Sequence, residues 1–222
     1  MSGLLKYGRE DKDNNGAWYI LDHTDVENAN IDTLVFIPND IDKSKVARIS
    51  VAERNTGSPS RESPKNLSDG EDFFGLSLKE RGERFFPNDL THLTEVIDVE
   101  KEQNSVLVYP VIVQRTGGEY YQQLTKSSLE PNQPRGFERI DKQVLTAIDA
   151  VRDELFKGGI DSYPDVDMLG QSAAGTFSQR FALLHLDRVH LSYSNGAKDG
   201  ITLPIESIEN PNTHENVMLP YC

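Results

Sequence analysis

Residues 167–175 read DMLGQSAAG, a short apolar strand pattern that runs through Gly170 and Ser172 straight into a helix pattern. A catalytic serine can occupy such a strand-to-helix turn, where its hydroxyl projects from a strained backbone. The residues two before and two after the serine must then be small, and here they are Gly170 and Ala174. The N–H of Ala173 would point at a developing oxyanion. Without its flanks, Gly-x-Ser-x-Ala equally fits a Gly-Ser turn that opens a helix.

The flanking pattern favours the first interpretation. On both sides of Ser172, apolar runs typical of strands occupy 105–113, 166–169 and 189–193. Apolar residues at helical spacing occupy 137–156 and 173–184. Strands that alternate with helices are typical of a parallel sheet covered by helices. The sequence therefore predicts an α/β fold with a mostly parallel sheet flanked by helices.

The first half of the chain adds weaker signals. We expect an edge strand at 18–21 and further strands at 33–37 and 46–52, and Pro110 predicts a bend or strand end in the most apolar run. Residues 58–90 are mostly polar and are interpreted as a surface insertion. With 222 residues, the chain is expected to form a single domain over 1–222.

A longer pattern around Ser172 carries a family resemblance. Four pieces stand in order: LVYPVIVQR (107–115), FERIDKQVLTAIDAVRDEL (137–155), DMLGQSAAGTFSQRFALLHLDRV (167–189), and Asn195-Gly196 to Leu203-Pro204. Residues 106–205 thereby resemble the α/β-hydrolases of the polyhydroxybutyrate-depolymerase and esterase-like branch, although Leu186 stands where that branch usually has proline. The resemblance implies a serine hydrolase that acts on a small-molecule carboxylic ester with Ser172 as nucleophile and without a cofactor.

The rest of a catalytic triad is less clear. In this fold the acid and then the histidine follow the serine, so Asp199 is the acid candidate and His214 the base candidate. Each also fits a plain loop residue. Two further histidines, His185 and His190, are interpreted as structural, and the two that precede the serine, His23 and His92, are in the wrong order for the fold. We see no metal-ligand spacing.

The second oxyanion donor is expected in the loop after the strand at 46–52. Thr56 and Gly57 fit that position, and they also fit an ordinary turn. The competing loop is 115–118, which follows the later apolar strand.

Composition narrows the function classes. The net charge of −13, from 36 acidic and 23 basic residues, argues against nucleic acid as a partner and favours a halophilic source as much as an ordinary acidic protein. No run is apolar enough to cross a membrane. The single cysteine, Cys222, and the polar N-terminal stretch indicate a cytoplasmic protein. Oligomeric state is left open.

The distance from Ser172 to the last residue raises two alternatives. Only 50 residues follow the serine (222 − 172), so relative to the family the chain is expected to be truncated at its C-terminus and weak in activity. It would then be a degenerate homologue that binds without turnover. The other alternative is a non-enzymatic interaction protein that uses the 58–90 insertion.

Overall fold

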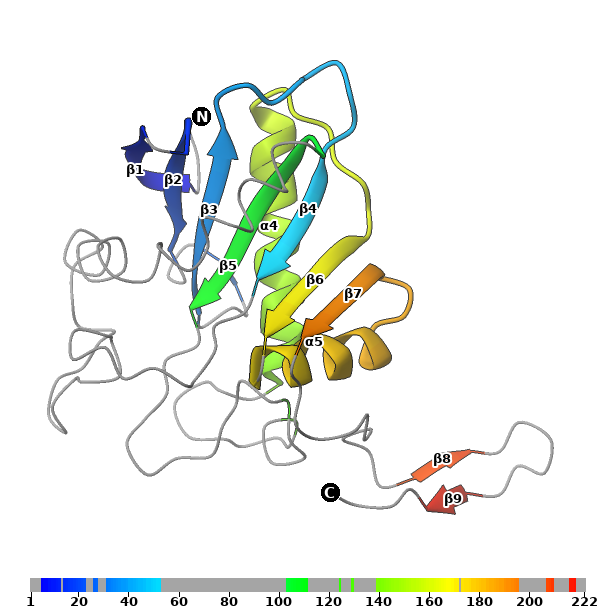
Figure 1. Ribbon diagram of the computed structural model, residues 1–222. Coiled ribbons are helices and arrows are strands. Elements are labelled where there is room, and N and C mark those ends of the chain that lie inside the picture. The colour runs from blue at the N-terminus through cyan, green and yellow to red at the C-terminus, as the bar shows by residue number, and fades with distance from the viewer. Residues whose placement is uncertain are drawn as a thin grey trace, which may run out of the picture.

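The computed structural model describes residues 5–12, 14–22, 26–27, 31–52, 103–111, 124, 129, 139–171, 173–195, 207–209 and 216–218. Within them, seven strands form one sheet in the order β1-β2-β3-β5-β4-β6-β7 (Figure 1). The strands are β1 (Leu5–Asp11), β2 (Gly16–Leu21), β3 (Asp32–Pro38), β4 (Arg48–Ala52), β5 (Ser105–Val111), β6 (Val166–Gln171) and β7 (Val189–Asn195). A separate antiparallel pair joins β8 (Ser207–Glu209) to β9 (Asn216–Met218).

The second half of this sheet is a block of parallel strands. β5 pairs with β4, β4 with β6, and β6 with β7, all in parallel. β1, β2, β3 and β5 are joined by antiparallel pairings, so β2 runs in the direction of the parallel block and five of the seven strands share one direction. This confirms the predicted fold class as far as an α/β fold with a mostly parallel sheet and flanking helices.

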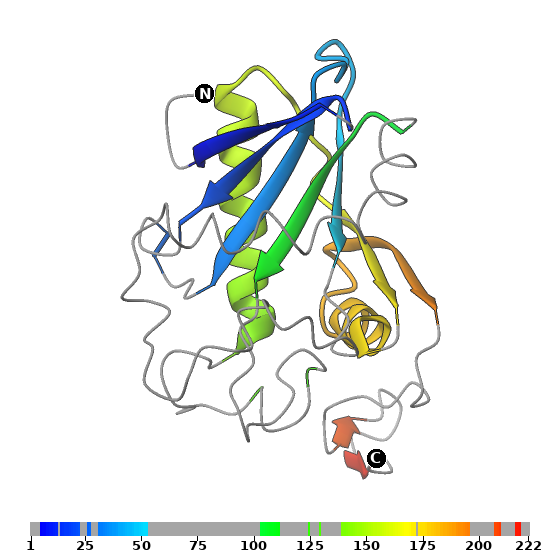
Figure 2. The same ribbon diagram turned by 60° about the vertical axis from the view of Figure 1, so that its left-hand side comes forward.

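Two helices form the crossovers within the parallel block. α4 (Ile140–Lys157) connects β5 to β6, and α5 (Ala173–Leu184) connects β6 to β7. Both connections move across the sheet in the same sense, so right-handed crossovers place both helices on one face. Consistent with this, side chains of α4 and α5 share one core with the strand residues Val51, Val108 and Met168. Figures 1 and 2 show α4 along the sheet and α5 at the lower ends of β6 and β7.

The apolar stripe of α4 explains why this segment is a helix. Five residues at spacings of three and four are fully buried: Ile140, Val144, Ile148, Val151 and Leu155. Phe137, the first residue of the predicted stripe, lies outside the described residues. Gly158 ends the helix with its N–H donating to the Glu154 carbonyl, and Gly159 follows with φ of +78°. The predicted helix and its glycine stop are therefore confirmed, with a start three residues later and an end one residue later than predicted.

The N-terminal hairpin corrects one prediction. The strand at 18–21 is not an edge strand, because β2 lies between β1 and β3. Its Trp18 is fully buried and packs against Phe36, with ring centroids 5.1 Å apart. The charged sequence of β1 hid this partner, although Asn14-Asn15-Gly16, with Asn15 at φ of 47°, is a strong hairpin signal.

Pro110 is accommodated by the change of pairing along β5. The parallel pairing with β4 ends at Val108, whereas the antiparallel pairing with β3 continues to Pro110 and Val111. Proline has no N–H to donate, so it fits beyond the end of the parallel ladder. The predicted strand end at Pro110 therefore holds for the pairing of β5 with β4 but not for its pairing with β3. The 58–90 insertion lies outside the described residues.

Candidate active site

The connection between β6 and α5 is very short. β6 ends at Gln171 and α5 begins at Ala173, so residue 172 alone separates them. Ser172 itself lies outside the described residues. The chain therefore reverses from strand to helix at the predicted position, at the carboxyl edge of the parallel strands, where α/β folds place their ligands.

Close packing across this turn requires glycine at 170. A Cβ added to Gly170 would lie 2.2 Å from the carbonyl oxygen of Ala174 and 2.6 Å from the nitrogen of Gly175. Both obstacles are backbone atoms at the start of α5, which cannot move aside without shifting the helix. The need for a small residue two before the serine is thus explained by direct contact with the residue two after it.

A second close approach holds α5 against β7. A Cβ on Gly175 would lie 2.4 Å from Oγ of Ser194 and 3.5 Å from the carbonyl oxygen of Asn195. Further along α5, Phe177 and Phe181 are fully buried and stack with ring centroids 5.7 Å apart. The helix is therefore anchored to the sheet at its first turn and along its length.

The start of α5 is electrostatically suited to a developing anion. The N-terminus of a helix carries a partial positive charge from its free N–H groups. The first turn of α5 contains no acidic residue that would offset this charge. Ala173, the predicted oxyanion donor, is the first residue of the helix.

The sheet register brings two of the predicted loops to this edge. Ala52, the last residue of β4, pairs with Leu169 of β6, and Asn195, the last residue of β7, pairs with Gln171. The chain therefore leaves β4 and β7 on either side of the turn at 172. In contrast, β5, which precedes the competing loop 115–118, is separated from β6 by β4.

The predicted loop residues lie outside the described residues. This holds for Asp199, His214, Thr56 and Gly57, and also for the loop 115–118. Their roles stay predictions.

Of the five histidines, the structure describes two, and both lie away from the turn. His185 follows the last residue of α5, a helix of 12 residues, which at 1.5 Å per residue places it about 18 Å along the axis from Ala173, the first residue of the helix. Its Nε2 lies 3.0 Å from Oδ2 of Asp141 at the start of α4. His185 therefore ties the end of one helix to the start of the other.

Asp141 is the centre of this connection. Its carboxylate is fully buried and accepts hydrogen bonds from Nε and Nη2 of Arg139 at 2.9 and 2.6 Å. Burial by itself raises the pKa of Asp141, but the hydrogen bonds from Arg139 and His185 hold that pKa well below its usual range. No local sequence signal indicates this cluster, because 44 residues separate Asp141 from His185.

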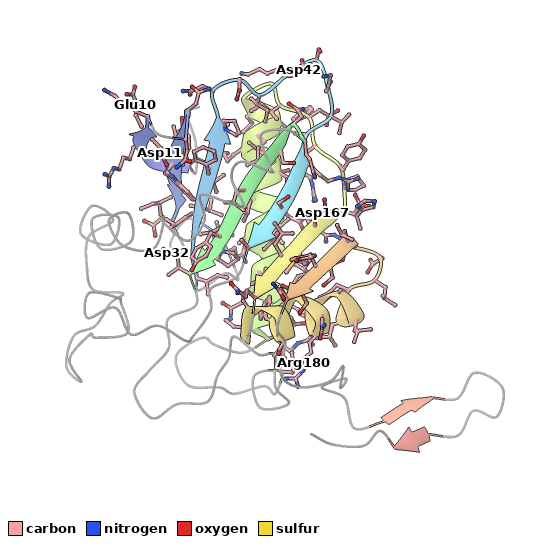
Figure 3. All side chains as sticks on the ribbon, in the orientation of Figure 1. Glu10, Asp11, Asp32, Asp42, Asp167 and Arg180 are labelled. Atoms are coloured by element: carbon pink, nitrogen blue, oxygen red, sulfur yellow. The ribbon has the colours of Figure 1, made fainter. Side chains whose placement is uncertain are left out.

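His190 is bonded to a carboxylate in the strand before the turn. Its Nδ1 lies 2.9 Å from Oδ1 of Asp167. Asp167 precedes Ser172 by five residues on an extended strand, or about 16 Å at 3.3 Å per residue. Figure 3 shows Asp167 on β6 and Arg180 on α5 at opposite ends of this part of the molecule. Neither described histidine can therefore reach residue 172 with a hydrogen bond.

Among the described residues, no group of three or more histidine, cysteine, aspartate or glutamate side chains could hold a metal ion. None of the described helices is long and apolar enough to cross a membrane.

The sequence matches no protein-family model and no curated protein sequence. Among solved structures, the chain is similar to poly(aspartic acid) hydrolase-1 from Sphingomonas sp. KT-1, with 16% identity over 80% of this chain and 55% of that chain and a TM-score of 0.46. It is also similar to an S-formylglutathione hydrolase from Agrobacterium tumefaciens, with 9% identity, coverage of 86% and 60%, and a TM-score of 0.45. The CE1 ferulic acid esterase AmCE1/Fae1A from Anaeromyces mucronatus is 12% identical, with coverage of 98% and 67% and a TM-score of 0.46. The chain thus spans less than two thirds of the length of the first two.

Proposed function

We propose that this chain is a serine hydrolase of the α/β-hydrolase fold that acts on a small-molecule carboxylic ester. The observation that carries the proposal is the one-residue turn between β6 and α5, with Gly170 pressed against the backbone of Ala174. In this proposal, a serine at such a turn would present its hydroxyl above the carboxyl edge of the sheet. Ser172 is the nucleophile in this proposal, and the resemblance to the depolymerase-like and esterase-like branch supports the ester substrate.

The proposed reaction begins with attack of the Ser172 hydroxyl on the ester carbonyl. The N–H of Ala173 donates to the oxyanion, and a second donor comes from the loop that contains Thr56 and Gly57. The register of β4 against β6 supports this loop over 115–118, because β4 is the direct neighbour of the strand that leads to the serine. Two preorganised donors typically lower the barrier more than any other single group.

A base must remove the proton of the hydroxyl, and an acid must orient that base. Asp199 and His214 are the candidates by chain order. The pairing of Asn195 with Gln171 supports Asp199, because the chain leaves β7 beside the turn only four residues before it. The positions of His185, just after the end of α5, and of His190, near the start of β7, argue against either as the base. We further propose a cytoplasmic location, which the single cysteine supports.

Labelling with a fluorophosphonate probe tests the nucleophile. We expect the probe to label the wild-type chain at Ser172, and Ser172→Ala to abolish both labelling and hydrolysis of p-nitrophenyl acetate. Ser44→Ala is the matched control, because Ser44 is an exposed serine that bonds only Asp42 among the described residues. Labelling that survives Ser172→Ala would contradict the proposal.

Turnover separates an enzyme from a binding homologue. With no assigned base, we expect slow hydrolysis, since oxyanion stabilisation alone leaves roughly a thousandfold rate over water. His214→Ala is expected to change this rate little. Rapid turnover that His214→Ala abolishes would identify His214 as the base. Ester binding without turnover would instead support the degenerate homologue, and the absence of both binding and labelling would favour an interaction protein.

A further inference from the structure

A concave site lies at the end of the sheet opposite the turn at 172. It is a groove of about 540 Å³ at the amino ends of the parallel strands. Its walls come from the residues before β4 and β5, the loop before β6, and the beginnings of β6 and β7. Asp167, labelled in Figure 3, belongs to this groove, and it is separated from residue 172 by the length of β6.

The floor of the groove is a network of paired charges, in which one arginine contacts two aspartates. Nη1 of Arg48 lies 2.8 Å from Asp165, and Nε of Arg48 lies 3.9 Å from Oδ2 of Asp167. The other Asp167 oxygen contacts His190, and the Arg48 guanidinium stacks over the Tyr163 ring at 4.2 Å. Because the charges are already paired, an ionic ligand gains little net attraction here. The Arg48 guanidinium has five N–H donors, and Nε2 of His190 is not used by the bond to Asp167, so hydrogen-bonding capacity remains.

The rim of the same groove is apolar. Val46, Tyr163 and Leu191 are 41%, 43% and 51% exposed, and they make up half of the six large hydrophobic side chains that the described residues leave exposed. Apolar surface that gathers around a polar floor, rather than being scattered singly, marks a binding site.

We propose that this groove binds a neutral polyhydroxylated ligand of the saccharide class. Each hydroxyl of a sugar can both donate and accept a hydrogen bond. The hydroxyls of one sugar can therefore bond to Asp167, Arg48 and His190 while the pairs among these charged side chains stay in place. The C–H faces of a sugar ring are apolar and fit against Tyr163 and Leu191. A carboxylate ligand would face Asp167, and a cationic ligand would face Arg48, so the pairing on the floor disfavours both.

Saturation-transfer NMR with maltose, cellobiose and xylobiose tests the proposal. The measurements use the full Ser172→Ala chain, so that no hydrolysis interferes and the result does not depend on the proposed esterase. We expect transfer from the protein to at least one of the three sugars and no transfer to gluconate, the charged comparison. Tyr163→Ala and Leu191→Asn should each raise the dissociation constant for the sugar roughly tenfold, as expected for the loss of one good contact.

Tyr193→Ala is the matched control, because Tyr193 is an exposed tyrosine two residues beyond Leu191 that does not line the groove. It should bind the sugar as the parent chain does. The proposal is wrong if none of the sugars binds, if gluconate binds in their place, or if Tyr163→Ala and Leu191→Asn both leave sugar binding unchanged. Both altered side chains are substantially exposed, so the variants are expected to fold.

Discussion

Gly170 shows how one missing side chain sets the geometry of the turn. We predict that Gly170→Ala destabilises the fold by about 1–3 kcal/mol, the usual cost of overpacking, because the new Cβ would lie 2.2 Å from the Ala174 carbonyl oxygen. Relief of the overlap must move the start of α5, so labelling of Ser172 by a fluorophosphonate should also fall. Urea unfolding and labelling rates measure the two effects.

Gly159→Ala provides the contrast. A Cβ there meets nothing within 4 Å, but the φ of +78° disfavours any side chain, so about 1–2 kcal/mol is lost through the backbone alone. Labelling of Ser172 should stay at the wild-type rate. If Gly170→Ala labelled as fast as Gly159→Ala, the packing across the turn would not control the nucleophile.

Asp141 gives a pH dependence at the residue scale. Its pKa is lowered in the folded chain, so its stabilising effect is complete above the unfolded pKa of about 3.9 and is lost as the pH falls through the folded value. We predict that Asp141→Asn costs about 1.5–3 kcal/mol at pH 7, as for hydrogen bonds to charged groups. The difference between the two chains should shrink steadily below pH 5.

Urea unfolding at pH 7 and at pH 3.5 measures this difference. Asp153→Asn is the control, because Asp153 lies on the exposed side of the same helix. It should change stability little at either pH. A cost for Asp141→Asn that is the same at both pH values would mean that the carboxylate is not charged in the native state.

At the scale of elements, local signals predicted the parallel block well. The stripe of α4 and the apolar runs of β5, β6 and β7 are local in sequence, and each element lies within a few residues of its prediction. The position of β4 between β5 and β6 is not a local property, because the helical crossover that passes over β4 decides it. The turn at Ser172 could likewise be predicted from one short motif, because it is local in sequence. The histidine that would act as the catalytic base could not be predicted, because it must come from a distant part of the chain.

The β1–β2 hairpin illustrates the opposite case. Trp18 was predicted to lie at an edge, but its indole Nε1 donates to Oδ2 of Asp11 at 3.0 Å, and the same carboxylate bonds Asn14. Apolar patterning does not reveal β1, because this strand is rich in charged residues and is joined to the turn and to β2 by hydrogen bonds that Asp11 accepts. The Asn14-Asn15-Gly16 turn is the one local signal in the sequence that indicates this hairpin.

This hairpin carries a prediction of its own. Asp11→Ala should destabilise the chain by about 1–3 kcal/mol, because the buried indole N–H of Trp18 would be left without its partner. Trp18 is the only tryptophan, so its fluorescence reports urea unfolding directly. Asp40→Ala, at an exposed position after β3, is the control. Equal midpoints for Asp11→Ala and the wild type would show that the indole bond contributes nothing to stability.

For the whole molecule, the dominant property is its net charge of −13. Repulsion among like charges opposes the compact state, and added salt screens it, with a Debye length that falls from about 30 Å at 0.01 M to about 3 Å at 1 M. We predict that the melting temperature rises with NaCl and that most of the rise is complete by roughly 0.5 M, where screening is nearly saturated.

A matched series distinguishes screening from other effects of salt. Sucrose stabilises proteins by exclusion from their surface and carries no charge, so it should raise the melting temperature in proportion to its concentration and without a plateau.

Reversal of surface charge gives the second control. Replacement of exposed acidic residues by lysine, as in Asp40→Lys with Asp153→Lys, should raise the melting temperature at low salt and flatten its salt dependence. Asp40 lies in the turn after β3 and Asp153 lies on α4, and both are exposed, so their effects should add. A wild-type melting temperature that is flat or falls with NaCl would rule out self-repulsion as a limit on stability, and with it the physical basis for expecting a halophilic source.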